Sequence, residues 1–220
     1  QTYTLRVSPQ LTDIWGGAMT EEFTYTFFTR PYSPNISLVA QTSTIFLTPQ
    51  DPSLVVQAVN ISSVPLSVGR VPLDYFIALL GPNGYELQNG LLNFERDTWT
   101  QSLSVPADRM QTAELFLRPD QQPLQPGIYF LRFEFDQPSG AAPEIYAGPY
   151  LLIVSNLQVT FKVSATEALA WVVDLRTDQP VANAPVTIYN EAGAAIAQGV
   201  TDAQGVYRGG RTLVDVPHLG

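Results

Sequence analysis

The sequence predicts an all-β fold made of tandem antiparallel β-sandwiches, and three observations support this prediction. Runs rich in Val, Ile, Thr, Tyr and Phe alternate with polar residues, which is typical of strands that bury one face. The 18 prolines and 15 glycines fall mostly between these runs, at the intervals of roughly eight to twelve residues expected of a sandwich. Hydrophobic residues make up 45% and charged residues 14% of the 220-residue chain, which indicates a globular protein rather than a disordered one.

The first thirty residues predict a β-hairpin. Residues 3–7 and 22–29 alternate as strands do, and residues 12–17 form the turn between them. We expect Gly17 to supply a positive φ in this turn. Because an isolated hairpin is marginal in water, we expect it to pack on the following domain or on another molecule, or to be mobile.

The middle of the chain predicts one closed sandwich over residues 35–155, with a short helix over residues 72–80. Pro72 suits the first helical position and Gly81 the position just past the end, while Phe76, Leu79 and Leu80 share a face. The aromatic residues of the strands are predicted to be core. The predicted strands are residues 54–60, 64–71, 98–105, 113–118, 127–135 and 148–154, and the predicted core residues are Trp99, Leu103, Tyr129 or Phe130, Leu131 and Leu152.

The last third of the chain repeats the pattern of strands and turns. Residues 170–175 alternate as a strand with one buried face, and Pro180 breaks it. Further strands are predicted at residues 186–189 and 195–200, separated and followed by turns at residues 190–193 and 202–205.

This order of residues resembles the macroglobulin domains of bacterial alpha-2-macroglobulin-like proteins. The resemblance is carried by Trp-Val-x-Asp-Leu at residues 171–175, Pro-Val-x-x-Ala-x-Val-x-x-Tyr at residues 180–189 and Gly-x-Thr-Asp-x-x-Gly at residues 199–205. Pro185 departs from the family pattern but is compatible with a strand start. Residues 64–76, 97–103 and 124–131 are similar to strands of a preceding macroglobulin domain.

The resemblance implies three domain pieces. Residues 1–31 resemble the tail of a bacterial Ig-like domain, residues 35–155 a macroglobulin-like sandwich, and residues 156–220 a second, truncated one. The family implies a protease-trapping (endopeptidase inhibitor) protein that is extracytoplasmic, in the periplasm or on the cell surface, and membrane-anchored in its full-length form. Its partners would be proteases and other domains of the same chain.

The inhibitory family traps proteases through a thioester between the Cys and Gln of a Cys-x-x-Gln motif. The chain has no cysteine, so it cannot form this bond, and no bait segment is recognisable. We therefore expect a non-catalytic scaffold fragment. The alternative is an Ig-like cell-surface adhesion or carbohydrate-binding module, which would need exposed aromatics on one sheet face. The candidates are Tyr25, Phe27, Tyr32, Tyr75, Tyr85 and Tyr146.

Charge and hydropathy argue against two further classes of partner. The net charge is −9 and the chain has no Lys/Arg cluster, whereas nucleic-acid binding needs a concentrated positive surface. The longest apolar runs, residues 75–80 and 150–154, fall short of the roughly twenty residues that cross a bilayer. Residues 1–3 begin a strand rather than a signal peptide. We expect neither nucleic-acid binding nor membrane contact from this fragment.

Catalytic residues are not expected, and neither are residues for a cofactor. His218 is the only histidine and has no partner nearby in sequence, so a Ser-His-Asp site is disfavoured. Glu134 and Asp136 lie on one face of a strand and could form a glycosidase pair, but solvent exposure is the ordinary interpretation.

Metal and glycan sites have weak signals as well. Asp174, Asp178 and Asp202 lie near loops without a calcium-binding spacing, so no metal site is predicted. Asn35 and Asn60 each begin an Asn-Ile-Ser glycosylation pattern, which is common by chance.

Overall fold

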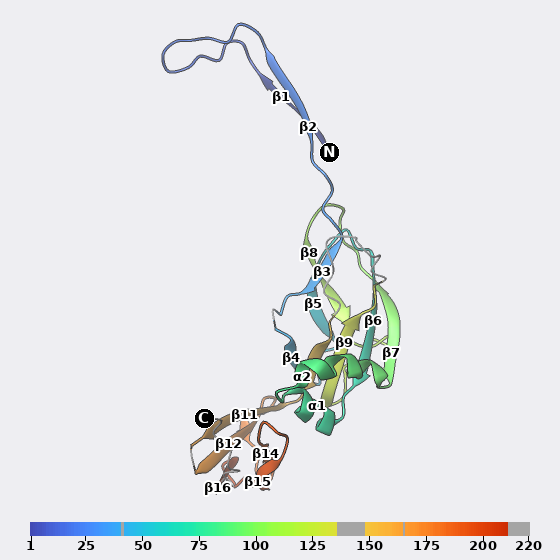
Figure 1. The fold of residues 1–220 in the computed structure, drawn as a ribbon, viewed down its shortest axis with the longest axis vertical. Helices are drawn as coiled ribbons and strands as arrows, with labels where there is room; N and C mark the ends of the chain where they lie inside the picture. The colour runs from blue at the N-terminus through green and yellow to red at the C-terminus, as the bar shows by residue number, and fades with distance from the viewer. Residues whose placement is uncertain (41, 136–147, 165, 211–220) are drawn as a thin grey trace.

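The computed structural model describes residues 1–40, 42–135, 148–164 and 166–210 of the chain. Three regions follow one another along the long axis: a projecting hairpin, a central region and a smaller C-terminal region (Figure 1). Their regular elements are mainly strands, and the few helices are short. The predicted all-β class of tandem sandwiches is confirmed.

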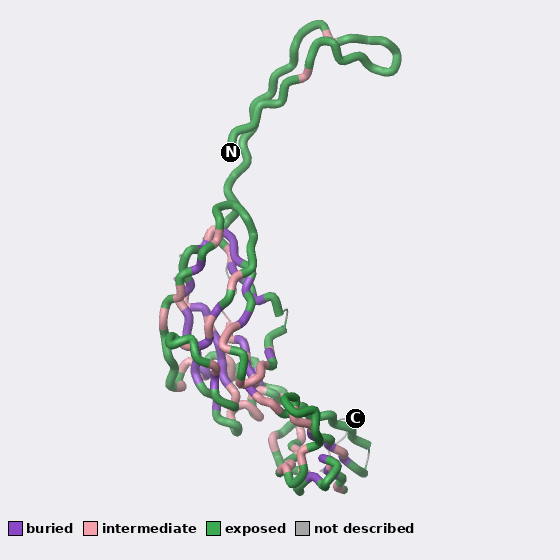
Figure 2. Tube along the Cα trace, turned by 180° about the vertical axis from the view of Figure 1, so that it is seen from behind, coloured by how far each residue is buried: buried purple, intermediate pink, exposed green. Residues whose placement is uncertain are grey.

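The hairpin consists of β1 (Thr2–Val7) and β2 (Phe23–Phe28), paired antiparallel from Thr2 opposite Phe28 to Val7 opposite Phe23. The predicted strands are confirmed. Almost every residue of both strands is exposed, and the hairpin extends away from the central region (Figure 2). The expected positive φ was assigned to the wrong glycine: Gly16 has a φ of 86°, whereas Gly17 does not lie in that region.

The central region contains two sheets that face each other. Five strands in the order β4-β10-β9-β6-β7 form one sheet, and three strands in the order β3-β5-β8 form the other. All six predicted strands are present. The bounds are β3 (Asn35–Leu38), β4 (Thr44–Leu47), β5 (Ser53–Val59), β6 (Ser63–Arg70), β7 (Arg96–Ser102), β8 (Gln111–Phe116), β9 (Gly127–Phe133) and β10 (Tyr150–Val154).

Two features of this region were not predicted. The short strands β3 and β4 were not predicted, and β4 pairs parallel with β10, from Thr44 opposite Leu151 to Leu47 opposite Val154. The expectation of purely antiparallel sheets was wrong at this edge. A parallel neighbour requires a long crossover, and here β5 to β9 lie between the two strands in sequence.

The core between these sheets is large and apolar. Leu131 and Leu152 are fully buried in this core and Leu103 and Tyr129 nearly so, as predicted. Phe130 is also fully buried, but on the other face of β9. Trp99 differs from its prediction because it is only partly buried, packed against the margin of the core from edge strand β7.

A side chain joins the two sheets where β7 approaches β8. The Gln101 Nε2 donates to the Glu114 carbonyl oxygen (2.7 Å), and its Oε1 accepts from the Phe116 N–H (2.8 Å). The Gln101 amide thus provides hydrogen-bond partners for backbone groups at the edge of β8, as a neighbouring strand would.

The predicted helix is present as α1 (Leu73–Leu79), followed by α2 (Gly84–Leu87) and a 3-10 helix, η1 (Gln88–Asn93), which were not predicted. Pro72 is the N-cap residue rather than the first helical residue. Phe76 and Leu79 pack in a small cluster around Phe130, but Leu80 is 65% exposed, so the three do not share a buried face.

The C-terminal region packs β14-β15 against a sheet in which β12 pairs with β11, β13 and β16. The predicted strands at residues 170–175, 186–189 and 195–200 are confirmed, and Pro180 pairs at an edge rather than ending all pairing. The bounds are β11 (Leu157–Val163), β12 (Glu167–Asp174), β13 (Gln179–Pro180), β14 (Pro185–Tyr189), β15 (Ala195–Val200) and β16 (Val206–Gly210).

Candidate functional site

The residues considered for catalysis do not form a site in the described part of the chain. Glu134 is half-buried, contrary to the expected exposure, and its Oε1 accepts from the hydroxyl of buried Ser67 (2.7 Å). Its other oxygen lies 3.9 Å from Arg132 Nε. Asp136 and His218 lie outside the described residues. The Glu134 carboxylate therefore holds neighbouring strands together.

The aspartates considered for calcium stabilise turns instead. Asp174 Oδ1 accepts from the Arg176 and Thr177 N–H groups, and Asp202 Oδ1 accepts from the Gln204 and Val206 N–H groups. These are Asx-turn bonds. Asp178 lies in the same turn as Asp174, with a φ of 56°. Within the described ranges, no three acidic or histidine side chains gather as a metal site would require.

One of the two glycosylation patterns is engaged in the fold. The Asn60 Nδ2 donates to the Tyr32 carbonyl oxygen (2.6 Å) and to Asp108 Oδ1 (2.9 Å), while its Oδ1 accepts from the Asp108 N–H (2.7 Å). This amide ties the segment after the hairpin to the loop before β8. A glycan on Asn60 would replace one of the two Nδ2 hydrogens and so remove one of the two donated bonds, whereas Asn35 is half-buried at the start of β3.

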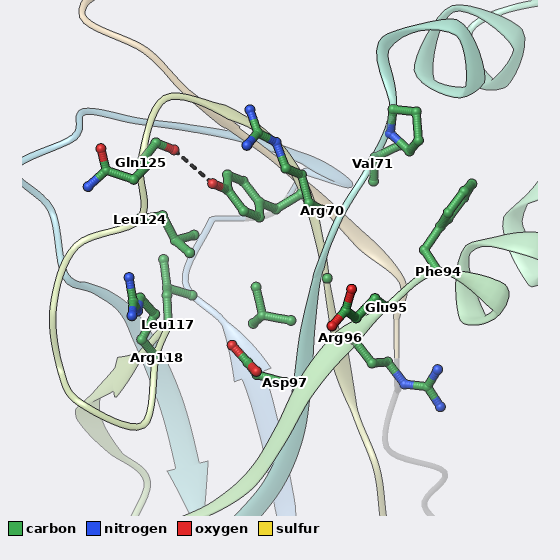
Figure 3. Close-up of a pocket in the computed structure, with 14 residues that line it drawn as sticks. Arg70, Val71, Phe94, Glu95, Arg96, Asp97, Leu117, Arg118, Leu124 and Gln125 are labelled. Carbon is green, nitrogen blue, oxygen red and sulfur yellow. Dashed lines mark hydrogen bonds between the residues drawn. The ribbon is translucent and has the colours of Figure 1, made fainter.

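A charged cleft of about 550 Å³ opens at one end of the central sandwich (Figure 3). Leu117 and Leu124 line this cleft together with acidic and basic side chains. Figure 3 shows the Arg96 guanidinium turned away from Arg70 and Arg118. The charged residues are Arg70, Glu95, Arg96, Asp97 and Arg118.

The arginines of this cleft already have partners in the fold. Arg70 donates to the Pro126 carbonyl oxygen (3.4 Å), Arg96 to the Leu92 carbonyl oxygen (2.6 Å), and Arg118 pairs with Asp120 (2.9 Å). The cleft has no cysteine, serine or histidine among its lining residues, so it offers none of the usual nucleophile and base pairs.

The aromatic residues considered for carbohydrate binding do not share one surface. Tyr25 and Phe27 lie on the hairpin, whereas Tyr85 is 84% exposed in α2. Tyr75 is half-buried: its ring packs edge-on against Phe94, and its hydroxyl donates to the Leu87 carbonyl oxygen (2.6 Å). Tyr32 is exposed in the segment after the hairpin, and Tyr146 lies outside the described residues.

Three exposed apolar surfaces stand out instead, of which the sequence predicted the hairpin face but not the other two. One face of the hairpin carries only apolar side chains, and a groove of about 500 Å³ separates α1 from the C-terminal region. The third surface is the loop at the tip of the hairpin, where Ile14 and Trp15 are 87% and 85% exposed. The hairpin face consists of Tyr3, Leu5, Val7, Phe23, Tyr25 and Phe27.

The groove lies where the central and C-terminal regions meet. Phe76 and Ile77 of α1 line one side, and Phe161 of β11 and Ile188 of β14 line the other. The central and C-terminal regions approach each other closely beside the groove. A Cβ on Gly81 of the central region would lie only 3.1 Å from the Glu191 carbonyl oxygen of the C-terminal region. The residues that line this groove are mostly apolar. No helix in the described ranges combines the length and the hydropathy needed to cross a lipid bilayer.

Comparison with known protein families identifies a match in the C-terminal region. Residues 154–214 match the family model of the bacterial alpha-2-macroglobulin MG3 domain. No curated protein sequence matches the chain.

Solved structures extend the likeness beyond the C-terminal region. A crystal structure of native alpha-2-macroglobulin from Escherichia coli spanning domains MG0, NIE and MG1 is similar with a TM-score of 0.71 at 17% identity, over 96% of this chain and 68% of that one. A structure of the same protein spanning NIE and MG1 has a TM-score of 0.58 at 18% identity, over 81% and 88%.

A Salmonella alpha-2-macroglobulin reacted with methylamine has a TM-score of 0.59 at 16% identity, and the match covers 95% of this chain but only 12% of that one. The predicted resemblance is therefore confirmed: residues 154–214 match a bacterial alpha-2-macroglobulin MG3 domain, and nearly the whole chain has the fold of bacterial alpha-2-macroglobulin domains.

Proposed function

We propose that this chain is a non-catalytic scaffold segment of a longer bacterial alpha-2-macroglobulin-like protein that traps proteases. The observation that carries the proposal is the match of residues 154–214 to a macroglobulin domain, next to a central sandwich whose fold extends the likeness. We assign residues 1–31 to the tail of an Ig-like domain, residues 35–155 to a macroglobulin-like sandwich and residues 156–220 to a second one.

The chemistry of the chain supports a structural role. Its cleft arginines, the Glu134 carboxylate and the turn aspartates are hydrogen-bonded within the fold. Covalent trapping needs an activated acyl group, and a chain without cysteine cannot form a Cys–Gln thioester. The groups that capture a protease would lie elsewhere in the longer protein.

The remaining parts of the proposal concern the longer protein. Its partners would be proteases and its own other domains, and it would act outside the cytoplasm, held at the membrane by a segment outside this chain. The match covers only 12% of the Salmonella chain. Most of the activity would therefore depend on other domains, which these sandwiches would position.

The experiment compares this 220-residue chain with the full-length protein. Each is incubated with trypsin-like and elastase-like proteases, and cleavage of a protein substrate and of a small peptide substrate is followed. A cage admits a peptide but excludes a protein, so the full-length protein should suppress only protein cleavage. The isolated chain should suppress neither.

Two results would overturn the proposal. Stoichiometric loss of protease activity with the isolated chain, or a covalent band on a denaturing gel, would place the working site in these sandwiches. Full-length protein that leaves protein cleavage untouched would show that the longer chain does not trap proteases.

A further inference from the structure

The loop at the tip of the hairpin, residues 12–18, has a defined structure although it lies far from any core. Thr12 and Ala18 form an antiparallel bridge, and the Asp13 N–H donates to the Gly17 carbonyl oxygen (2.9 Å). Asp13 Oδ1 accepts from the Trp15 N–H (2.9 Å) and the Gly17 N–H (2.8 Å). One carboxylate therefore holds the backbone on both sides of the tip.

The two glycines make this conformation possible. Gly16 has a φ of 86°, which residues with a side chain rarely adopt. A Cβ on Gly17 would lie 2.9 Å from Asp13 Oδ2, so a larger residue there would require the Asp13 carboxylate to shift. The backbone that presents Ile14 and Trp15 is thus ordered before any partner arrives.

The side chains at the tip point into solvent. Ile14 is 87% and Trp15 85% exposed, and neighbouring Leu11 is 58% exposed. An exposed Trp on a rigid loop is unusual for a soluble protein, and Trp is among the residues that dominate binding energy at protein interfaces. Holding it in place in advance lowers the entropy lost on binding.

The position of the loop separates it from the strand face of the hairpin. It lies beyond the ends of β1 and β2, at the end of the molecule farthest from the C-terminal region (Figure 1). A sandwich domain that covered the apolar face of these strands would leave their connecting loop at its end, where loops of sandwiches gather. This step rests on the proposed assignment of residues 1–31 to an Ig-like sandwich.

The charge around the tip distinguishes between partners. Residues 8–22 contain Asp13, Glu21 and Glu22 but no lysine or arginine. Peripheral attachment to anionic lipid uses basic residues beside apolar ones, so an acidic loop is unsuited to it. A protein pocket with an apolar floor and a cationic rim complements both the indole and the carboxylates.

We propose that the tip loop is a preorganised docking element, in which Trp15 and Ile14 insert into an apolar pocket bordered by Lys or Arg on a folded protein partner. Trp15 is the central anchor, and Asp13 is a positioning residue that acts by holding the loop. Glu21 and Glu22 steer the approach of the partner.

The test begins with a photo-crosslinking residue, p-benzoylphenylalanine, in place of Ile14 in the full-length protein, in the cells that produce it. Tyr85, which is equally exposed at 84%, carries the same group as a matched control. The protein crosslinked at position 14 is then purified and titrated against the 220-residue chain.

Trp15→Ala should weaken this affinity about 30-fold, the effect of a typical interface hot spot, while Tyr85→Ala leaves it unchanged. Asp13→Ala should weaken it less, and Glu21→Lys with Glu22→Lys should slow association most at low salt. Circular dichroism checks that each variant keeps its strands.

Three results would overturn the proposal. The first is a crosslink yield at position 14 that is no higher than the yield at position 85. The second is a crosslinked partner that binds the Trp15→Ala variant as tightly as it binds the unchanged chain. The third is co-sedimentation with phosphatidylcholine or phosphatidylglycerol vesicles that is lost in Trp15→Ala, because it would assign the loop to a lipid surface.

Discussion

The central region and the hairpin both carry aromatic residues on their strands, but they bury these residues to very different extents. In β9 of the central region Phe133 is fully buried, whereas in β2 of the hairpin Phe27 remains 41% exposed. β2 alternates aromatic residues with threonine over most of its length, whereas β9 is apolar throughout residues 128–131 and is covered on one face by the second sheet and on the other by α1. The difference shows that alternation produces a strand with an apolar face, whereas burial of that face depends on what packs against it.

The C-terminal region lies between these extremes. Its main cluster consists of Ala170, Ala197 and Tyr207 with two partly buried neighbours, and Ala168 and Val172 are buried as well. Val159 and Phe161 of edge strand β11 remain 56% and 49% exposed. Two sheets are present, but β14 and β15 cover only part of the larger one, so its stability depends more on individual polar contacts.

The largest expected effect separates two phenylalanines. Phe133→Ala leaves a cavity between the two central sheets and should lower the free energy of unfolding by about 3–5 kcal/mol. Phe27→Ala removes a side chain that is already partly hydrated, and should change the free energy of unfolding by less than about 0.5 kcal/mol. Urea unfolding followed by circular dichroism measures both. Equal losses would mean that the hairpin face is buried in solution.

A smaller effect is expected at the only fully buried polar side chain of the described C-terminal region. The Thr201 hydroxyl donates to the Val181 carbonyl oxygen (2.6 Å) and accepts from the Ala184 N–H (2.9 Å). Thr201→Val keeps the shape but leaves both groups without this partner, so unfolding should become easier by about 2–3 kcal/mol. Exposed Thr187→Val in β14 is the control. Thermal unfolding that is the same for both variants would contradict the prediction.

The bridge between the central sheets should contribute less. Gln101→Ala removes the acceptor of the Phe116 N–H and the donor to the Glu114 carbonyl oxygen, at a site that water reaches more easily. We expect a loss of about 1–2 kcal/mol and faster hydrogen exchange at Phe116. Gln57→Ala, on the exposed side of β5, is the matched control and should change neither quantity.

The smallest effect on global stability is expected at the tip of the hairpin. Asp13→Ala removes the acceptor of two N–H groups that solvent can reach, so the free energy of unfolding should change by less than about 0.5 kcal/mol. Amide exchange of Trp15 and Gly17 should nevertheless accelerate, because these groups lose their partner. A large drop in the unfolding midpoint would show that the tip and the central region unfold as one unit.

The sequence predicted strands well where alternation or a turn residue was strong. The turn at Asn190 separates the strands Pro185–Tyr189 and Ala195–Val200, and the turn at Asp202 comes after the second strand. Both side chains accept backbone N–H groups, so the turn residues marked the ends of these strands. The short strand Thr44–Leu47 was missed because it has only four residues, although a turn held by Thr48 and Asp51 follows it. This strand exists because β10 supplies a parallel partner from far along the chain.

Predictions about side-chain environment failed where the environment is set by a distant element. Trp99 was expected in the core, but β7 is an edge strand and leaves it half-exposed. Glu134 was expected in solvent, but Ser67 on the neighbouring strand donates to it. Leu80 was placed with Phe76, but the helix ends there and turns its side chain toward solvent. The environments of Trp99 and Glu134 depend on residues far away in the sequence, whereas that of Leu80 depends on where α1 ends.

The sequence by itself determined the all-β class, the turns and the resemblance to macroglobulin domains, because these depend on local backbone preferences and on residue order. The tertiary structure alone decided which apolar faces are covered: the β9 face is buried, while the hairpin face and the tip at Trp15 are open. The physical reason is that a strand pattern specifies a face with a two-residue period, whereas burial requires a second surface whose position depends on contacts between residues far apart in the chain.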